Sequence, residues 1–338
     1  MTEKQVVVRR LDLPGAIACL KEAQQVAEQA NVVVVDFGGF EWAEPLGMLV
    51  FGASLRDLRA ETKKLRPEVK FRAIGYEGRG YLAHMGLFKL FGLNYGKAPD
   101  EAEGGSRYEP IRFIDLAELE RNAAEEYQDT HEYIDKTCQG MASLLVQSGS
   151  EVLSETLGYC LREIVRNVLE HAQVGGLWYC GQYWPQKDKV ELGLFDLGMG
   201  VRRALSRNPH ITVDSDQEAI RLAIKPGISG AAFQGARQMR NDGWQNSGFG
   251  LYMTSQIAAQ YGQFRLGSGD SLMTFDAKGQ EFQEFGLKGT AVSISLRPSK
   301  VTKLAERLSE LRKAAKSGGS GGEATTVRSA SAYGRGKT

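Results

Sequence analysis

Apolar and polar positions follow strand-like and helix-like patterns in turn across the N-terminal third of the chain. Short β-branched runs at Gln5–Val8, Val32–Val35 and Phe71–Ile74 predict strands. Val32–Val35 is continuously apolar, which is typical of a strand buried on both faces. Pro14–Ala30 and Pro45–Lys64 carry helix formers between these runs. We therefore expect a small α/β layer in this part of the chain.

The pattern changes after a connection that is rich in Gly, Glu and Pro. Asn94–Arg107 reads as a loop, Tyr108–Leu116 as an extended segment, and residues 117–148 favour helix. We expect this helical stretch to begin a second domain.

Residues 151–172 predict a strongly amphipathic helix. Its apolar positions recur with a period of 3.6 and share one face; they are Leu157, Leu161, Ile164, Val165, Val168 and Ala172. Glu163 and Asn167 are four residues apart, so they lie side by side on another face. His171 follows one turn later, at the boundary between the two faces.

A predicted strand and two glycines follow this helix. Val190–Phe195 predicts a strand that ends in Asp196, followed by Gly198 and Gly200. Glycines at these positions allow the backbone to approach a ligand closely.

The long glycine-rich stretch 201–246 is of a length that is usually functional or disordered. Next, the run Ser247, Gly248, Phe249, Gly250, Leu251 opens a helix that continues to about Tyr261. The free N–H groups at the start of such a helix suit phosphate binding. Gly289 and Thr290 begin the strand Ala291–Leu296.

In this order, the four motifs resemble the GHKL ATP-binding family, which includes gyrase, heat-shock chaperone ATPases, histidine kinases and anti-sigma-factor serine kinases. The resemblance covers about residues 140–298. It implies a Bergerat-fold α/β sandwich, in which a mixed sheet is covered by helices on one face. The spacing Glu163, Asn167, His171 is most similar to that of the serine kinases.

The resemblance implies ATP and Mg²⁺ as cofactors and a role for each motif. Asn167 would supply an oxygen to Mg²⁺, and Glu163 would act as general base toward water or a protein hydroxyl. Asp196 would accept a hydrogen bond from the adenine amino group, with Thr290 near it. Gly198 and Gly200 would line the base.

The remaining implied nucleotide-binding residues are Ser247, Gly248, Phe249, Gly250 and Leu251. Two roles stay open for His171. It is either a histidine packed at the helix boundary or a residue of the nucleotide site.

The stretches Val32–Gly47 and Tyr81–Phe88 resemble a STAS domain, a small α/β module best known from anti-sigma-factor antagonists. The family usually carries a phosphorylated Ser or Thr just before the helix that follows the buried strand. Here Glu44–Gly47 has no hydroxyl. Any protein substrate is therefore expected elsewhere.

The C-terminal segment 297–338 has ten basic and three acidic residues. Residues 299–316 predict an amphipathic helix that forms a packing or dimer surface, and 317–338 a disordered, basic Gly/Ser-rich tail. A solvated tether is favoured over contact with nucleic acid. The expected division is thus a STAS-like domain at 1–107, a connector at 108–139, the ATPase domain at 140–298, the helix and the tail.

Bulk properties are those of a globular protein with room for two domains. The chain has 338 residues, 25 % of them charged, and a net charge of +1, so no global field selects nucleic acid or membrane. Four scattered cysteines fit reduced thiols in a cytoplasmic protein. No signal peptide and no membrane span are expected.

We therefore expect a cytoplasmic signalling or switch protein that binds Mg-ATP and either hydrolyses it or phosphorylates a protein Ser or Thr. Protein partners are expected, and a homodimer remains open. Two alternatives remain. One is an ATP-gated clamp on a macromolecule such as DNA, as in gyrase relatives, although few residues are left for a transducer domain. The other is a non-catalytic ATP sensor, and a stress or phage-defence setting is compatible with either.

Overall fold

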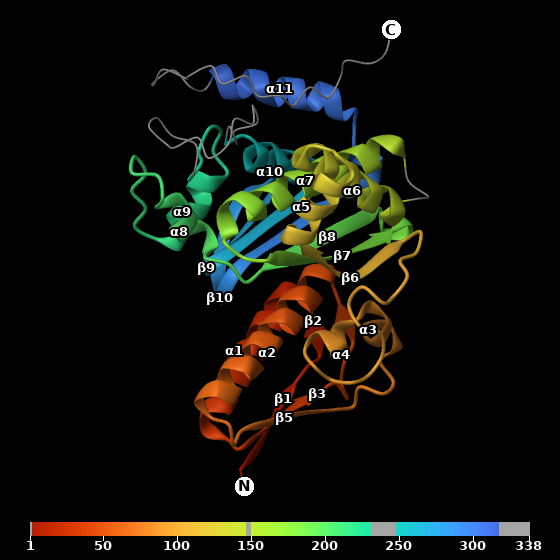
Figure 1. Cartoon of the computed structure of the whole chain (residues 1–338), viewed down its shortest axis with the longest axis vertical. Coiled ribbons are helices and arrows are strands. Elements are labelled where there is room, and N and C mark those ends of the chain that lie inside the picture. Colours follow the sequence, from red (N-terminus) through yellow and green to blue (C-terminus); the bar gives the residue numbers. More distant parts are fainter. Residues whose placement is uncertain (1, 147–149, 231–247, 318–338) are drawn as a thin grey trace.

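A three-stranded parallel sheet in the order β1-β3-β5 forms the centre of the N-terminal part of the computed structural model (Figure 1). The central strand β3 (Val32–Asp36) has the buried residues Val33, Val34 and Val35, so the predicted strand is confirmed. The structure describes residues 2–146, 150–230 and 248–317. The other elements of this part are β1 (Glu3–Val7), β2 (Arg10–Leu11), α1 (Leu13–Gln29), β4 (Trp42–Ala43), α2 (Pro45–Leu65), β5 (Lys70–Ile74), α3 (Gly80–Met85) and α4 (Leu87–Leu90).

A five-stranded sheet in the order β6-β7-β8-β10-β9 forms the second part. All neighbouring strands in it are antiparallel, so the expectation of a mixed sheet is wrong. Two of its four strand pairs, β7–β8 and β9–β10, are hairpins, and a short turn can join only antiparallel strands. The strands are β6 (Tyr108–Asp115), β7 (Gly176–Trp184), β8 (Lys189–Asp196), β9 (Gly262–Asp276) and β10 (Gly279–Leu296).

Helices α6, α7 and α10 cover one face of this sheet, which we call the front face (Figure 1). The helical stretch predicted at 117–148 is two helices, and the predicted boundary at 139/140 falls inside the second. The elements of this layer are α5 (Leu116–Glu125), α6 (Thr130–Leu145), α7 (Glu151–Asn167), α8 (Gly200–Leu205), α9 (Asp216–Ala223), α10 (Gly250–Tyr261) and α11 (Leu304–Ser317).

The opposite face of the sheet, the back face, is covered by α1 and α2 of the N-terminal part. Phe195 and Ala291 of the sheet are fully buried in one hydrophobic cluster with Leu46 and Phe51 of α2. Helices therefore cover both faces, and the expectation of one covered face is wrong. The N-terminal part serves as the second helical layer of the C-terminal sheet.

Close backbone contact and a charged cluster hold α2 against the back face. The thiol of Cys180 donates to the Pro45 carbonyl oxygen at 3.3 Å. The carboxylate of Glu44, at the N-terminus of α2, contacts Lys189 Nζ at 3.2 Å and Arg265 Nη1 at 3.5 Å. The segment Glu44–Gly47 thus lies in the interface between the two parts.

Helix α11 packs onto α7 and α10 through Leu304, Leu308 and Leu311, which are all buried. The sequence left two uses open for this apolar stripe, a packing surface or a dimer surface. In the structure, the stripe packs within the chain. The predicted tail at 318–338 lies outside the described residues. Over the described ranges, none of the helices has the length and apolar character needed to cross a membrane.

The close approach of α2 to β8 gives a first prediction. A Cβ on Gly193 would lie 2.7 Å from Leu46 N and 2.8 Å from Leu46 Cα, which are backbone atoms that cannot move away alone. Gly193→Ala is therefore expected to lower the free energy of unfolding by about 1–3 kcal/mol. Urea denaturation measures the change.

Gly140→Ala is the matched control, because a Cβ on Gly140 of α6 meets nothing within 4 Å. This variant should be neutral or slightly more stable, since alanine favours helix over glycine. Equal stability of the two variants would contradict the described packing of α2 on β8.

Candidate functional site

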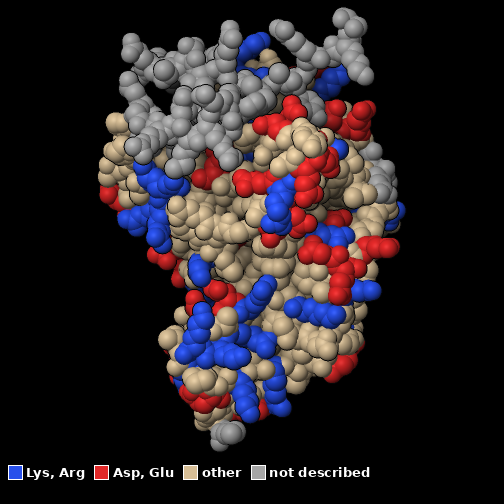
Figure 2. Space-filling model, viewed as in Figure 1, with Lys and Arg blue, Asp and Glu red and all other residues tan. Residues whose placement is uncertain are grey.

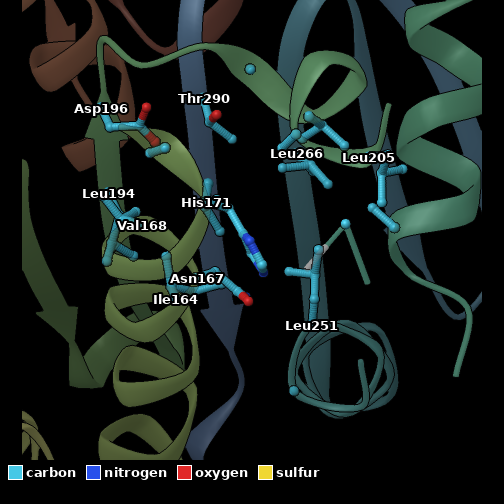
Figure 3. A pocket seen from close by; sticks show the side chains of 18 of the residues that line it. Ile164, Asn167, Val168, His171, Leu194, Asp196, Leu205, Leu251, Leu266 and Thr290 are labelled. Carbon is cyan, nitrogen blue, oxygen red and sulfur yellow. The ribbon is translucent and has the colours of Figure 1, made fainter. Parts of the chain in front are cut away.

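The front face carries a pocket between α7, α10 and the adjacent ends of β8 and β10. It encloses about 910 Å³, part of it continuous with open solvent. We call it the front pocket. Figure 3 shows Asp196 and Thr290 at one end, the Asn167 and His171 side chains entering from the α7 side, and Leu251 and Leu205 across from them. Residues more than 120 positions apart in the chain thus share one hollow.

Helix α7 positions Asn167 and His171. Its N-cap is Ser150, whose side-chain oxygen accepts from Leu153 N, and its apolar stripe is buried against the sheet and α6. The α-helical part ends at Asn167 and continues as a π-helical turn, Val168–Ala172, which ends at Gln173 in the left-handed conformation. Such turns are rare and often occur at functional sites. The predicted helix over 151–172 is therefore α-helical only to Asn167.

The two side chains enter the pocket with unused polar atoms. Asn167 Nδ2 and His171 Nδ1 are buried and have no close hydrogen-bond partner in the described part of the chain, although the His171 ring interacts with the Glu170 backbone. Burial and the nearby Arg207 charge lower the pKa of His171 to about 4. The imidazole is therefore neutral at pH 7. Buried polar atoms without partners are costly, so both atoms are candidates for ligand contact.

Asp196 lies at the end of β8, directly opposite Thr290 of β10. Burial raises the pKa of Asp196 to about 6, although hydrogen bonds from Gly198 N, at 2.8 Å, and from Thr290 act in the opposite direction. The carboxylate is 4 % exposed and has no cation among these partners. It is a buried acceptor at the closed end of the pocket.

Two glycines allow the loop after Asp196 to lie tightly against its neighbours. A Cβ on Gly198 would be 2.6 Å from the Ala172 carbonyl oxygen, and one on Gly289 would be 1.9 Å from the Asp196 carbonyl oxygen. Gly289 also has φ +92°, a conformation that favours glycine. Gly198 therefore acts behind the pocket wall, whereas Gly200 lines the pocket itself.

The N-terminus of α10 forms the other end. Gly248, Gly250 and Leu251 line the pocket, whereas the N-cap Phe249 packs against the core and provides no side-chain cap. Phe249 therefore does not cap the first N–H groups of α10, and no other side chain within the described residues is seen to do so. Ser247 lies outside the described residues.

Glu163 is the one predicted catalytic residue, and it does not line the pocket. Its Oε1 accepts from Arg162 Nη2 at 2.6 Å and from Arg162 Nε at 3.1 Å. Its Oε2 faces Gly250, where an added Cβ would be 1.9 Å away. The carboxylate thus lies directly behind the first residue of α10, with one oxygen held by arginine.

Arg162 is itself buried and shared. It also contacts Asp135 Oδ2 of α6 at 3.4 Å, and its guanidinium carbon lies 4.7 Å from the Tyr159 ring centroid. Burial alone would lower the pKa of Arg162, but the carboxylates of Glu163 and Asp135 together raise it. The Arg162–Glu163 pair was not expected from the sequence.

The pocket contains more apolar surface than the motifs indicated. Sequence reasoning missed the lining residues Val168, Leu194, Leu205, Ile228, Leu266 and Val292. Their signal was only that of ordinary core positions, so pattern alone could not separate them. An apolar hollow with a few polar groups is typical of a site for an organic ligand.

No group of three or more His, Cys, Asp or Glu side chains in the described ranges could hold a metal ion. Away from its Asp196 end, the pocket offers the side-chain oxygens of Asn167 and Ser229 as hard donors. A magnesium ion would fit only with most of its ligands supplied by phosphates and water, as is common for this ion.

Comparison with known proteins gave no match: no protein-family model, no curated protein and no solved structure is similar to this chain.

The raised pKa of Asp196 predicts how stability depends on pH. An unfolded aspartate has a pKa of about 3.9, so folding favours the protonated form, and wild-type stability is lost as the pH rises from about 4 to about 6. Asp196→Asn removes this loss and retains an acceptor for Gly198 N. At pH 7.5 the variant should be more stable than wild type by up to about 3 kcal/mol, and near pH 4 the difference should vanish.

Urea denaturation at the two pH values measures this difference. All other titrating groups are common to both proteins and cancel in the comparison. A stability difference that is the same at pH 4 and pH 7.5 would show that Asp196 is not a buried carboxyl of raised pKa.

Proposed function

We propose that the front pocket binds Mg-ATP and that the protein is a nucleotide-dependent signalling or switch protein of the GHKL type. The observation that carries the proposal is the convergence of Asn167, His171, Asp196, Thr290 and the start of α10 on one apolar hollow. These residues come from four separate segments of the chain. A shared ligand explains why polar groups from all four meet there.

The Asp196 end supports an adenine site. Its buried carboxylate accepts from Gly198 N and Thr290 and still has acceptor capacity, which an amino group of a base can use. The apolar residues Val168, Leu194 and Leu266 beside it suit a flat ring. Guanine presents a carbonyl oxygen where adenine has its amino group, so the same carboxylate would disfavour it.

The opposite end supports a triphosphate. The uncapped N–H groups at the start of α10 and the helix dipole favour an anion. Asn167 lies between this end and the Asp196 end, where its amide oxygen could serve a phosphate-bound Mg²⁺. Neutral His171 can exchange a hydrogen bond with the ligand without adding charge.

Glu163 supports a reaction on the condition that its carboxylate can accept a proton. One carboxylate oxygen, Oε2, lies against Gly250 at the proposed phosphate end, where it could receive a proton from water or from a protein hydroxyl. The other oxygen is held by Arg162. We propose that the ion pair with Arg162 keeps the Glu163 carboxylate oriented, but a weak proton acceptor, until a nucleotide binds.

The protein hydroxyl, if there is one, is not at the STAS-like position. Pro45, Leu46 and Gly47 are buried against the back face, away from the front pocket. The Ser54 hydroxyl is also buried. A substrate hydroxyl would therefore lie elsewhere than in this segment.

A second candidate, a non-catalytic ATP sensor, is favoured by the same Arg162–Glu163 contact. A carboxylate that accepts two bonds from a buried arginine is a poor proton acceptor. In that case, ATP would act by changing the position of α10 and the loop after Asp196. Experiments on turnover separate the two candidates.

Asp196→Ala tests the adenine site. We expect the affinity for ATP to fall at least about tenfold, because a hydrogen bond to a buried carboxylate is worth about 1.5–3 kcal/mol. Affinity for GTP should change little. Titration calorimetry with both nucleotides measures the difference.

Glu125→Ala on the exposed surface of α5 is the matched control and should bind like wild type. Asn167→Ala should abolish ATP binding or its magnesium dependence. An unchanged ratio of ATP to GTP affinity in Asp196→Ala would refute the adenine assignment.

Glu163→Gln tests the chemistry. The amide keeps an acceptor for Arg162 but cannot take a proton, so ATP binding should persist while turnover falls by about 10²-fold or more. Incubation with γ-labelled ATP, alone and with cell lysate, reports free phosphate for an ATPase and a labelled protein for a kinase.

Glu151→Gln, in the exposed first turn of the same helix, is the control and should retain wild-type turnover. Undiminished turnover in Glu163→Gln would exclude it as the base. No product from wild-type protein that does bind ATP would favour the sensor.

A further inference from the structure

A second hollow lies on the back face, where α2 crosses the start of β7. It spans about 750 Å³, part of it open to solvent. We call it the rear crevice. Its main lining residues are Arg56, Asp57, Phe113, Val174, Trp178 and Leu197.

The sheet side of the rear crevice is aromatic. Phe113 of β6 and Trp178 of β7 are neighbours across the sheet, and their ring centroids are 4.4 Å apart at an angle of 49°. Both side chains are only partly buried. The α2 side contributes the short side chains of Ala53 and Ala60, which leave room in front of the rings. The shape suits a planar ring.

The rear crevice carries charges of both signs. Lys288 Nζ lies 3.1 Å from Asp57 Oδ2 and 3.8 Å from Glu61 Oε1, so this lysine is shared between two carboxylates. The guanidinium carbon of Arg56 lies 5.8 Å from the Trp178 ring centroid, and Arg56 has no carboxylate partner within the described residues. Figure 2 shows further basic side chains gathered over α1 and α2. A ligand that stacks on Trp178 therefore meets an arginine whose charge is free to pair with an anion.

The rear crevice and the front pocket lie back to back and share two strand ends. In β7, Leu177 lines the front pocket and the next residue, Trp178, lines the rear crevice. Likewise, Asp196 lines the front pocket and Leu197 lines the rear crevice. Alternate side chains of a strand point to opposite faces, so a ligand that displaces Leu197 acts on the residue next to Asp196.

We propose that the rear crevice binds a planar aromatic anion, with its ring on Trp178 and Phe113 and its charge on Arg56, and that this ligand changes the nucleotide affinity of the front pocket. The anion site is proposed from the residues of the rear crevice alone and can be tested without a nucleotide. The coupling rests on the proposed function, because it is measured with ATP.

Direct binding is tested with indole-3-carboxylate and its neutral analogue indole-3-carboxamide, by titration calorimetry on the full chain. We expect the carboxylate to bind about tenfold more tightly, since a charge-assisted hydrogen bond to arginine is stronger than a neutral one. Arg56→Gln should remove this preference. Trp178→Leu should weaken both probes about tenfold.

Lys64→Gln removes the same charge from the exposed surface of α2, away from the crevice, and should bind like wild type. Thermal unfolding checks that each variant is folded. No binding of either probe, or a loss in Lys64→Gln equal to that in Arg56→Gln, would overturn the site.

The coupling is tested by titrating ATP with and without saturating indole-3-carboxylate. We expect the dissociation constant of ATP to change at least about threefold in wild type and not in Arg56→Gln. By linkage, ATP must change the affinity for the probe by the same factor. An ATP affinity that does not depend on the probe would overturn the coupling. Absence of any ATP binding would refute the proposed function while the direct-binding result stands.

Discussion

The structure depends on the burial of both faces of the five-stranded antiparallel sheet. Alternate residues of β8 point into two different cores: Leu194 faces α7 and the front pocket, and Phe195 faces α2. Each fully buried side chain of this size contributes about 1.5–3 kcal/mol. Neither face can be exposed without losing several such contributions, so the N-terminal helices are part of the sheet's stability as well as of their own domain.

This arrangement provides a physical route for the proposed coupling between the two pockets. The loop after Asp196 is fixed from the front by Ala172, whose carbonyl oxygen accepts from Met199 N at 3.2 Å. It is fixed from behind by Leu197, which packs against the core shared with α2. A change on either side must be accommodated by the same few residues. The fused N-terminal part is thus placed to sense or to alter the front pocket through the sheet rather than through its opening.

Much of the fold could be predicted because its signals are local. The periodicity of residues 151–172 identified α7, and the valine run at 32–35 identified the central strand β3. The strands β7 and β9 were not predicted, because glycines and polar residues such as Gln182 and Gly267 interrupt their alternation. The packing of α2 on the back face also could not be predicted. Gly193 was its only signal, since a glycine inside an apolar strand often marks the close approach of another backbone.

In the candidate site, too, local motifs could be predicted from the sequence and tertiary contacts could not. Asn167, Asp196, Gly250 and Thr290 were selected by motif, and the structure brings all four to one hollow. The order of residues could not reveal that α7 becomes a π-helical turn after Asn167, or that Arg162 would hold Glu163. Both depend on tertiary contacts, and both decide how the pocket functions.

Hydrogen exchange measured by mass spectrometry, with and without Mg-ATP, tests whether the front pocket is the nucleotide site. We expect slower exchange of backbone amides at 164–172, 196–201 and 248–253, with the strands β1, β3 and β5 unchanged. Protection confined to other segments, or none at ATP concentrations that saturate binding, would contradict the assignment of the front pocket as the nucleotide site.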